Sequence, residues 1–353
     1  LLPPAPPAPP APACAPFPYR PAPQVLAECK KVADCLHASS ALVVRDPRCN
    51  TEHNNAFIDM MEEYFAQSEE AKKPDERAEM HYQVGVTPEG VEVPKCVASA
   101  ECLKEIAAQP EQHRAVFPKG ADPKWRFFWK LGERPRETRF AELNAAPVLP
   151  KAFPGWKDQM DKWGGLMLGA VEVVSIMAAV GLGLPEDAFV GKMKCAPHLL
   201  APTGSDLSKY HDLNQIFAGY HYDLNFITIH GKSRFPGLYV WLRDGSKVPV
   251  KVPDGCLLCQ AGKQIEWLTA GYVRAGMHEV ICTPKTQEAM EKARAEGRST
   301  WRVSSTVFSH LASDEKMSPM GRYADLPEAK DYPETYVGDY VQQELEDLEL
   351  KTS

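Results

Sequence analysis

Short β-rich runs follow one another closely in the second half of the chain, and their spacing limits the possible folds more than any other feature. Turn sequences such as Asp244-Gly245 and Asp254-Gly255 separate these runs. Many short strands with turns between them are typical of a barrel or a double sheet. The runs that we predict to be strands are residues 226–230, 238–242, 247–252 and 256–260.

The first half of the chain is predicted to be mainly helical, which makes the whole chain α+β. Residues 1–23 form a Pro/Ala-rich tract that we expect to be extended and disordered. A helical region over 24–193 and a β-rich region over 194–353 follow. We predict helices at 24–37, 51–67, 156–183, 283–298 (a charged insertion) and 337–350, and a short helix that begins at Pro185. A strand is predicted at 40–44, and loops over 74–154 with an extended segment at 85–92.

One apolar stretch, residues 164–184, is long enough to span a bilayer. Glu172 lies near its middle, where a charge is costly in lipid, and no basic segment flanks it. We therefore predict a helix buried in a folded core and no membrane association.

The 353-residue chain has a net charge of −7 and no dense Lys/Arg block, so nucleic acid is not an expected partner. Its ten cysteines are scattered, unlike the framework of a small secreted domain. We expect an intracellular protein, cytoplasmic or organellar. Cys256 and Cys259 form a CxxC without a second pair, which favours structural thiols over a zinc or redox site.

Three residues stand out as possible metal ligands: His221, Asp223 and His278. His221 and Asp223 are two apart, so in an extended strand they would point to the same face. Two histidines and one carboxylate suit non-haem Fe(II), because they leave coordination positions open. With ten histidines in the chain, the spacing alone also fits ordinary histidines of the surface or core.

The surrounding sequence resembles the isopenicillin-N-synthase-like family of Fe(II)/2-oxoglutarate-dependent dioxygenases. The family pattern HxDxxxLT resembles His221 to Thr228, and its GLxV strand resembles Gly237 to Val240. Further similarities, in chain order, are Gly262 with Trp267 and Thr269, the distal segment His278-Glu279-Val280, and Arg302-Val303-Ser304, which resembles the family's RxS. The resemblance spans roughly residues 24–345.

This resemblance implies a double-stranded β-helix (jelly-roll) core with the helical N-terminal half packed against it. It implies that His221, Asp223 and His278 hold Fe(II), and that Arg302 and Ser304 bind the far carboxylate of the co-substrate 2-oxoglutarate. The expected activity is O2-dependent hydroxylation, desaturation or ring closure of a small molecule with release of succinate and CO2. Ascorbate is a candidate reductant, and we expect a monomer.

The chain also departs from the family pattern. The usual Asn-x-Tyr-Pro is replaced by residues 198–202, which offer neither Asn nor Tyr. His198 could substitute as a co-substrate contact, but we favour an ordinary strand residue. Gly262-Lys263 stands where the family has Gly-Asp, and the insertion 283–298 is interpreted as a solvated excursion rather than a lid.

Phe308 and His310 follow Ser304 at even spacing, so we predict that they point into the barrel mouth as either core or substrate contacts. Tyr222 should point away from the pocket. Two alternatives to the leading function remain at this point. One is an iron oxidase of the same fold that does not use 2-oxoglutarate, and the other is a binding protein that keeps the fold without turnover.

Overall fold

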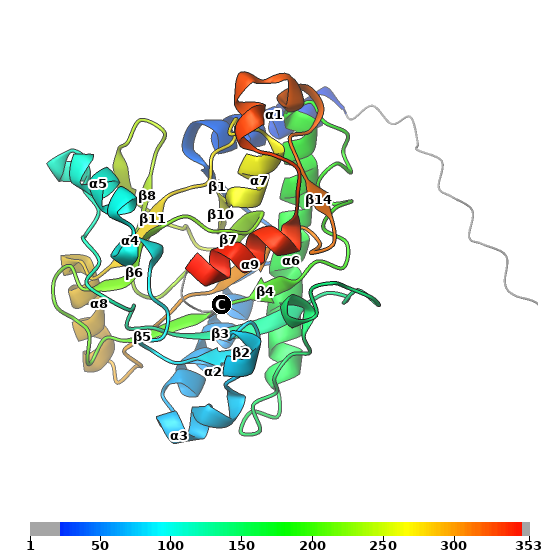
Figure 1. The fold of residues 1–353 in the computed structure, drawn as a ribbon. Helices are drawn as coiled ribbons and strands as arrows, with labels where there is room; N and C mark the ends of the chain where they lie inside the picture. Colours follow the sequence, from blue (N-terminus) through cyan, green and yellow to red (C-terminus); the bar gives the residue numbers. More distant parts are fainter. Residues whose placement is uncertain (1–21, 348–353) are drawn as a thin grey trace, which may run out of the picture.

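The computed structural model describes residues 22–347 (Figure 1). The Pro/Ala-rich tract lies outside this range except for Ala22 and Pro23, and Pro23 is already the first residue of helix α1. The helices are α1 (Pro23–Ser39), α2 (Thr51–Phe65), α3 (Glu69–Lys72), α4 (Lys95–Ala98), α5 (Ala100–Ala108), α6 (Trp156–Gly181), α7 (Lys263–Leu268), α8 (Pro284–Ala295) and α9 (Val337–Asp347).

Within this range, two antiparallel sheets form the centre of the molecule. The larger has nine strands in the order β1-β10-β7-β13-β4-β3-β5-β12 with β2 beside β3, the smaller has the order β6-β11-β8-β9, and β14 pairs with β15. The strands are β1 (Ala41–Val44), β2 (Gly85–Thr87), β3 (Trp125–Leu131), β4 (His198–Leu200), β5 (Thr203–Asp206), β6 (Ile216–His221), β7 (Ile227–His230), β8 (Leu238–Trp241), β9 (Lys247–Pro249), β10 (Leu257–Ala261), β11 (His278–Ile281), β12 (Trp301–Val303), β13 (Thr306–Ser309), β14 (Lys316–Met317) and β15 (Thr335–Tyr336).

This curled antiparallel core with helices against it confirms the α+β, jelly-roll prediction. The four predicted strands after residue 226 correspond to β7, β8, β9 and β10. Strands β1, β2 and β3 come from the N-terminal half, so that half extends the larger sheet as well as covering it.

Helix α6 runs along one side of the sheets (Figure 1) and packs against α1, α2 and β13. Of the described helices, it is the one long and apolar enough to cross a membrane, and half of its most apolar stretch is buried within the protein. The approach to α1 is close: a Cβ on Gly181 would lie 2.1 Å from the carbonyl oxygen of Cys29. Any larger residue at this position would therefore push the two helices apart.

Strand β2 lies within the extended segment predicted at 85–92, but helices α4 and α5 and strand β3 correct the prediction of loops for the rest of 74–154. The correction that matters for the site is strand β3. Its seven residues are all buried and pair with β2, β4 and β5. Aromatic residues occur on both of its faces, and Pro- and Gly-rich segments flank it, so neither alternation nor composition marked it as a strand.

The predicted short helix from Pro185 is also wrong. Residues 185–193 form successive turns in which the i to i+3 bonds, such as Ala188 N–H to Pro185 O, outnumber the one i to i+4 bond from Gly191 to Asp187. The predicted last helix is α9, and its residues 348–350 lie outside the described range. Helix α8 anchors Met290 and Ala293 in a small cluster with Phe217 and Phe235, and Phe235 also lines the main cavity.

The CxxC cysteines are both free thiols, with Cys259 fully buried in β10. Burial raises the pKa of the Cys259 thiol to about 12, so this thiol is a packed core group rather than a reactive one. A disulfide joins Cys96 in α4 to Cys102 in α5.

We predict that Phe127→Ala lowers the free energy of unfolding by about 3–5 kcal/mol, because it empties a fully buried position of β3. Denaturant unfolding followed by circular dichroism measures the change. The same substitution at Phe117, which is 43% exposed, serves as the control and should cost less than about 1 kcal/mol. Equal losses in the two variants would contradict the assignment of β3 to the core.

Candidate metal centre and its cavity

The pairing of β6 with β11 places His221 directly opposite His278. The two imidazole centroids are 4.2 Å apart. Asp223 completes the group: its Oδ1 lies 3.7 Å from Nε2 of His221 and 3.8 Å from Nε2 of His278. Within the described residues, this is the one cluster of His, Cys, Asp and Glu whose ligand atoms are close enough to share a metal ion.

Asp223 reaches this position differently from the sequence-based argument. Strand β6 ends at His221, so Asp223 lies in the following loop and not on the same strand face. The loop is held by the turn after β10, where the Lys263 N–H donates to the Asp223 carbonyl at 2.8 Å. A Cβ on Gly262 would lie 2.1 Å from the Asn225 carbonyl oxygen, so the close approach of this turn requires glycine.

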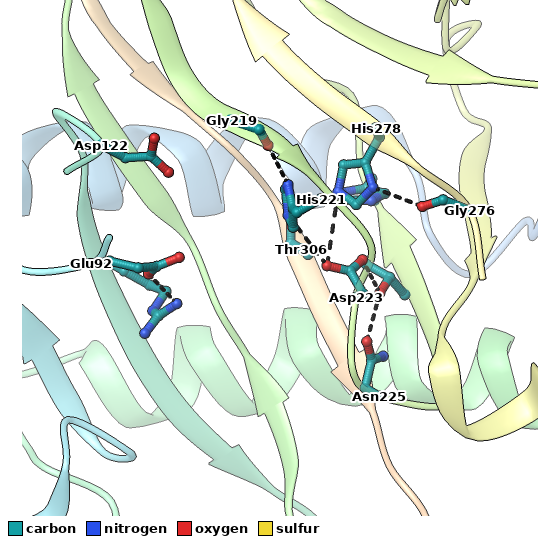
Figure 2. Close-up of polar contacts among 12 residues, drawn as sticks. Glu92, Asp122, Gly219, His221, Asp223, Asn225, Gly276, His278 and Thr306 are labelled. Atoms are coloured by element: carbon teal, nitrogen blue, oxygen red, sulfur yellow. Dashed lines mark hydrogen bonds and ion pairs between the residues drawn. The ribbon is translucent and has the colours of Figure 1, made fainter. Parts of the chain in front are cut away.

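Neighbouring groups orient all three side chains (Figure 2). Nδ1 of His221 lies 2.6 Å from the Gly219 carbonyl oxygen, and Nδ1 of His278 lies 3.1 Å from that of Gly276. A proton on Nδ1 donates to these acceptors and leaves each Nε2 lone pair for a metal. The Thr228 hydroxyl donates to Oδ2 of Asp223 at 2.6 Å, which leaves Oδ1 facing the two rings.

The electrostatics also suit a cation. Burial and the neighbouring His278 lower the pKa of His221 to about 4, so this imidazole is neutral at neutral pH. Burial alone would raise the pKa of Asp223, but His278, His221 and the Thr228 hydrogen bond lower it. A neutral imidazole beside an ionised carboxylate is the state in which this donor set binds a divalent metal.

The triad lies in a cavity of about 980 Å³, and all seven site residues predicted from the sequence line it. Arg302 is 6% exposed, and its Nε has a long contact of 3.5 Å to the Pro236 carbonyl oxygen. It has no carboxylate partner among the described residues, and burial lowers its pKa to about 10. The Ser304 hydroxyl oxygen accepts hydrogen bonds from the Thr203 N–H and hydroxyl, both at 2.9 Å, so its own proton is available to a ligand.

Of the remaining candidate residues, Phe308 and His310 line the cavity and His198 does not. Phe308 lines the cavity and packs edge-on against Phe128, with centroids 6.3 Å apart. His310 lines the cavity too, and its N–H donates to Nδ1 of His198 at 3.0 Å. His198 itself is buried, is absent from the cavity wall and contacts the Met193 carbonyl, as expected for an ordinary strand residue.

The prediction that Tyr222 points away from the pocket is wrong, because the structure places it in the cavity wall next to α9. Its hydroxyl donates to Glu344 of α9 at 3.4 Å, and Lys263 lies over its ring. The expected outward direction assumed that the strand continued beyond His221, which it does not.

Several charged residues of the cavity were missed by the sequence analysis. Glu92 and Asp122 lie to one side of the triad (Figure 2). Lys124 lies 3.0 Å from Glu92 and 2.8 Å from Asp122, and Arg126 pairs with Glu92. The charged residues at 122, 124, 126 and 130 have the even spacing of one strand face, and this spacing could have indicated them.

Two further groups complete the wall. Lys130 lines the cavity from the far end of β3, and His230 lines it from the end of β7. Nδ1 of His230 lies 3.0 Å from the Thr306 hydroxyl, whereas its buried Nε2 has no hydrogen-bond partner within residues 22–347.

Part of the chain matches a known protein family. Residues 205–311 match the family model of the 2OG-Fe(II) oxygenase superfamily. This segment belongs to that superfamily. The match confirms the assignment to the non-haem Fe(II)/2-oxoglutarate dioxygenases, and it leaves the isopenicillin-N-synthase-like subfamily as a prediction.

Solved structures share the fold over nearly the whole chain. A 2OG-Fe(II) oxygenase family protein from Caulobacter crescentus superposes with a TM-score of 0.71 at 22% identity, covering 94% of this chain and 96% of that one. A Neurospora crassa protein in complex with alpha-KG and thymine gives 0.68 at 16% identity, covering 91% of each chain. The rice dioxygenase for auxin oxidation gives 0.58 at 15% identity, covering 91% and 90%. No curated protein matches the sequence.

We predict that Asp223→Ala lowers the affinity for Fe(II) by more than about 100-fold, because it removes a ligand from the triad. Thr228→Val should lower the Fe(II) affinity by about 10- to 100-fold, because the second oxygen of Asp223 loses its hydrogen bond. Anaerobic calorimetric titration with Fe(II) measures both affinities. Asp254→Ala removes an exposed carboxylate and is the control; a normal affinity in Asp223→Ala would refute the metal site.

A second prediction concerns acid stability. Burial opposes ionisation of Glu92, but the charges of Arg126 and Lys124 more than offset it and lower its pKa to about 2 from 4.5. The stability that ionised Glu92 contributes is complete above pH 4.5 and is lost as the pH falls through about 2. Urea unfolding should show that the free energy of unfolding of the wild type falls by on the order of 3 kcal/mol more than that of Glu92→Gln between these pH limits. Exposed Glu63→Gln should follow the wild type, and parallel curves for all three proteins would contradict the pairing.

Proposed function

We propose that this protein uses Fe(II), O2 and 2-oxoglutarate to oxidise a C–H bond of a small molecule. In the hydroxylation form of the reaction, one oxygen atom of O2 enters the substrate as a hydroxyl group. The other enters succinate as 2-oxoglutarate loses CO2. Desaturation and ring closure are the alternative outcomes for the same site. The observation that carries the proposal is the His221–Asp223–His278 triad in one cavity with the unpaired, buried Arg302.

The residues of the triad fit Fe(II) because two imidazole Nε2 atoms and one carboxylate oxygen converge, each fixed by a partner on its other side. When bound, the iron would supply the activation of O2. The protein's own contribution is to hold the three ligands without rearrangement and to leave the cavity side of the metal open to co-substrate and oxygen. Strands β6 and β11 supply the rigid support that such positioning needs.

Arg302 and Ser304 would hold the far carboxylate of 2-oxoglutarate. A guanidinium group binds a carboxylate through two parallel N–H donors, and the Ser304 hydroxyl can donate a third hydrogen bond. Arg302 is buried without an acidic partner, which is costly unless a ligand supplies the missing charge. Orientation by these two groups would direct the 2-oxo acid end of the co-substrate to the metal.

The cavity supports a small-molecule substrate rather than a macromolecule. Its volume of about 980 Å³ is at the upper end for drug-sized ligands. Helix α9 crosses in front of the core (Figure 1), and its residues Val341, Glu344 and Leu345 line the cavity. Among proteins of this fold, the Neurospora crassa protein binds thymine together with alpha-KG, and JOX2 binds JA together with 2OG and Fe.

The test of this proposal is an anaerobic Fe(II) titration followed by visible absorption, with and without 2-oxoglutarate. A weak charge-transfer band that requires both components would support bidentate binding of the 2-oxo acid to iron. Iron binding without the band would favour the oxidase that does not use 2-oxoglutarate. The replaced segment 198–202 would then be the suspected cause, because Leu199 and Ala201 make this part of the cavity wall apolar. Failure to bind iron would favour a binding protein and reject the enzyme.

We predict that Arg302→Gln raises the 2-oxoglutarate concentration needed for half of the maximal charge-transfer absorption by about 10- to 100-fold. A loss of this size is expected when one charge-assisted hydrogen bond is removed, which changes the affinity by about 10- to 100-fold. Its Fe(II) affinity should stay within about twofold of wild type, because Arg302 does not contact the triad. Arg234→Gln is the matched control, since Arg234 lines the same cavity but pairs with Asp59 and Glu62. An unchanged 2-oxoglutarate requirement in Arg302→Gln would remove this residue from the co-substrate site.

A further inference from the structure

Strand β3 turns an unusual face toward the cavity. Its side chains alternate, so that Trp125, Phe127, Trp129 and Leu131 enter the core, whereas Arg126, Phe128 and Lys130 line the cavity. Lys124, just before the strand, faces the same way. Lys124 and Arg126 are neutralised by Glu92 and Asp122, and Lys130 is not.

Lys130 is a buried amine with most of its hydrogen-bonding capacity unused. The residue is 8% exposed, and its Nζ donates one hydrogen bond, to the Leu143 carbonyl oxygen at 2.6 Å. In its protonated form the amine has three donors, so two remain. No carboxylate of residues 22–347 lies within 4 Å of Nζ, and an unpaired buried charge is costly. The cavity thus contains a donor group that lacks an anion.

The position of Lys130 separates it from the proposed 2-oxoglutarate site. Arg126 pairs with Thr203, whose hydroxyl bonds Ser304, so this end of β3 faces the co-substrate side. Lys130 pairs with Leu199, four residues farther along β3, which is about 13 Å at 3.3 Å per residue. Lys130 and His310 line the same cavity. Burial lowers the pKa of His310, and the charges of His198 and Lys130 lower it further.

The surroundings of Lys130 on the cavity wall are apolar. Phe128, Leu199, Ala201 and Phe308 form one cluster, to which β3, β4 and β13 contribute. This cluster lies in the cavity that also contains the metal triad. A ligand that filled the space would bury an apolar body against the cluster and place a polar end at Lys130.

We propose that Lys130 is the anion-binding group of the substrate site. The substrate is then a small apolar acid whose carboxylate pairs with Nζ of Lys130 and whose body lies against Phe128, Leu199 and Phe308. This inference rests on the proposed function, because it assigns the substrate class of the same site. Burial lowers the pKa of Lys130 to about 7, so an approaching carboxylate would complete protonation of the amine and gain a charge-assisted hydrogen bond.

The test compares acids with their neutral analogues. Benzoate, phenylacetate, cyclohexanecarboxylate and octanoate are titrated against their primary amides by calorimetry, under anaerobic conditions with Fe(II) and saturating 2-oxoglutarate. Saturation with 2-oxoglutarate occupies Arg302, so that the probes cannot use it. The proteins are wild type, Lys130→Met, Lys130→Gln and the control Lys251→Met, which removes an exposed lysine from the rim of the same cavity.

In the wild type and in Lys251→Met, we expect at least one acid to bind about 10-fold or more tightly than its amide. In Lys130→Met and Lys130→Gln, the acid should bind no better than the amide, whereas the affinity of the amide should stay unchanged. Met matches the length of Lys and removes a buried charge, so the variant is expected to fold. The charge-transfer band with 2-oxoglutarate should be the same in all four proteins.

Three outcomes would overturn the inference: no acid binds to the wild type, acids and amides bind equally, or the preference for acids survives in Lys130→Met. The proposed function is judged separately by the charge-transfer band. If the wild type lacked the band but preferred acids through Lys130, the anion site would stand and the oxygenase assignment would fall. If the band appeared without any preference for acids, the oxygenase assignment would stand and the anion site would fall.

Discussion

The register between β6 and β11 is the constraint on which the site depends. Opposed residues in an antiparallel pair have neighbouring side chains, so the His221–His278 pairing fixes the two imidazoles side by side. Each ring then contacts the carbonyl of a glycine two residues earlier, Gly219 or Gly276. A shift of one residue would turn one ring to the other face of the sheet and break its carbonyl contact. The rest of the fold holds this pairing in place.

The sequence predicted those parts of the fold that depend on local pattern. Strands β7, β8 and β10 are short apolar runs between turns, and helix α6 is a long apolar segment, so each could be recognised alone. Strand β3 could not, because its identity as a strand comes from pairing with β2, β4 and β5, which lie far from it in sequence. Long-range pairing also gave the N-terminal half a share of the sheet that its helical composition did not indicate.

In the candidate site too, the local motif could be recognised from the sequence, whereas the contacts between distant segments could not. The triad could be named from its motif, but the argument from strand alternation failed at Asp223 and Tyr222, because β6 stops at His221. What brings Asp223 to the two histidines is a loop, fixed by a hydroxyl from Thr228 and a backbone N–H from Lys263. The charged wall of the cavity was missed because its residues look like ordinary surface charges until the face of β3 is known.

The cations of the cavity differ in whether the protein itself neutralises them. Lys124 and Arg126 are paired with Glu92 and Asp122, so the protein itself balances their charges. Arg302 and Lys130 lack such partners. With Fe(II) and the dianion of 2-oxoglutarate bound, the charges of the metal, Asp223, Arg302 and the co-substrate would cancel, and protonated Lys130 would carry the one uncompensated charge among these groups. A substrate anion offsets the energetic cost of burying that charge, whereas beside a neutral substrate the amine can lose its proton instead. Selectivity would then come from the unpaired lysine rather than from the shape of the wall.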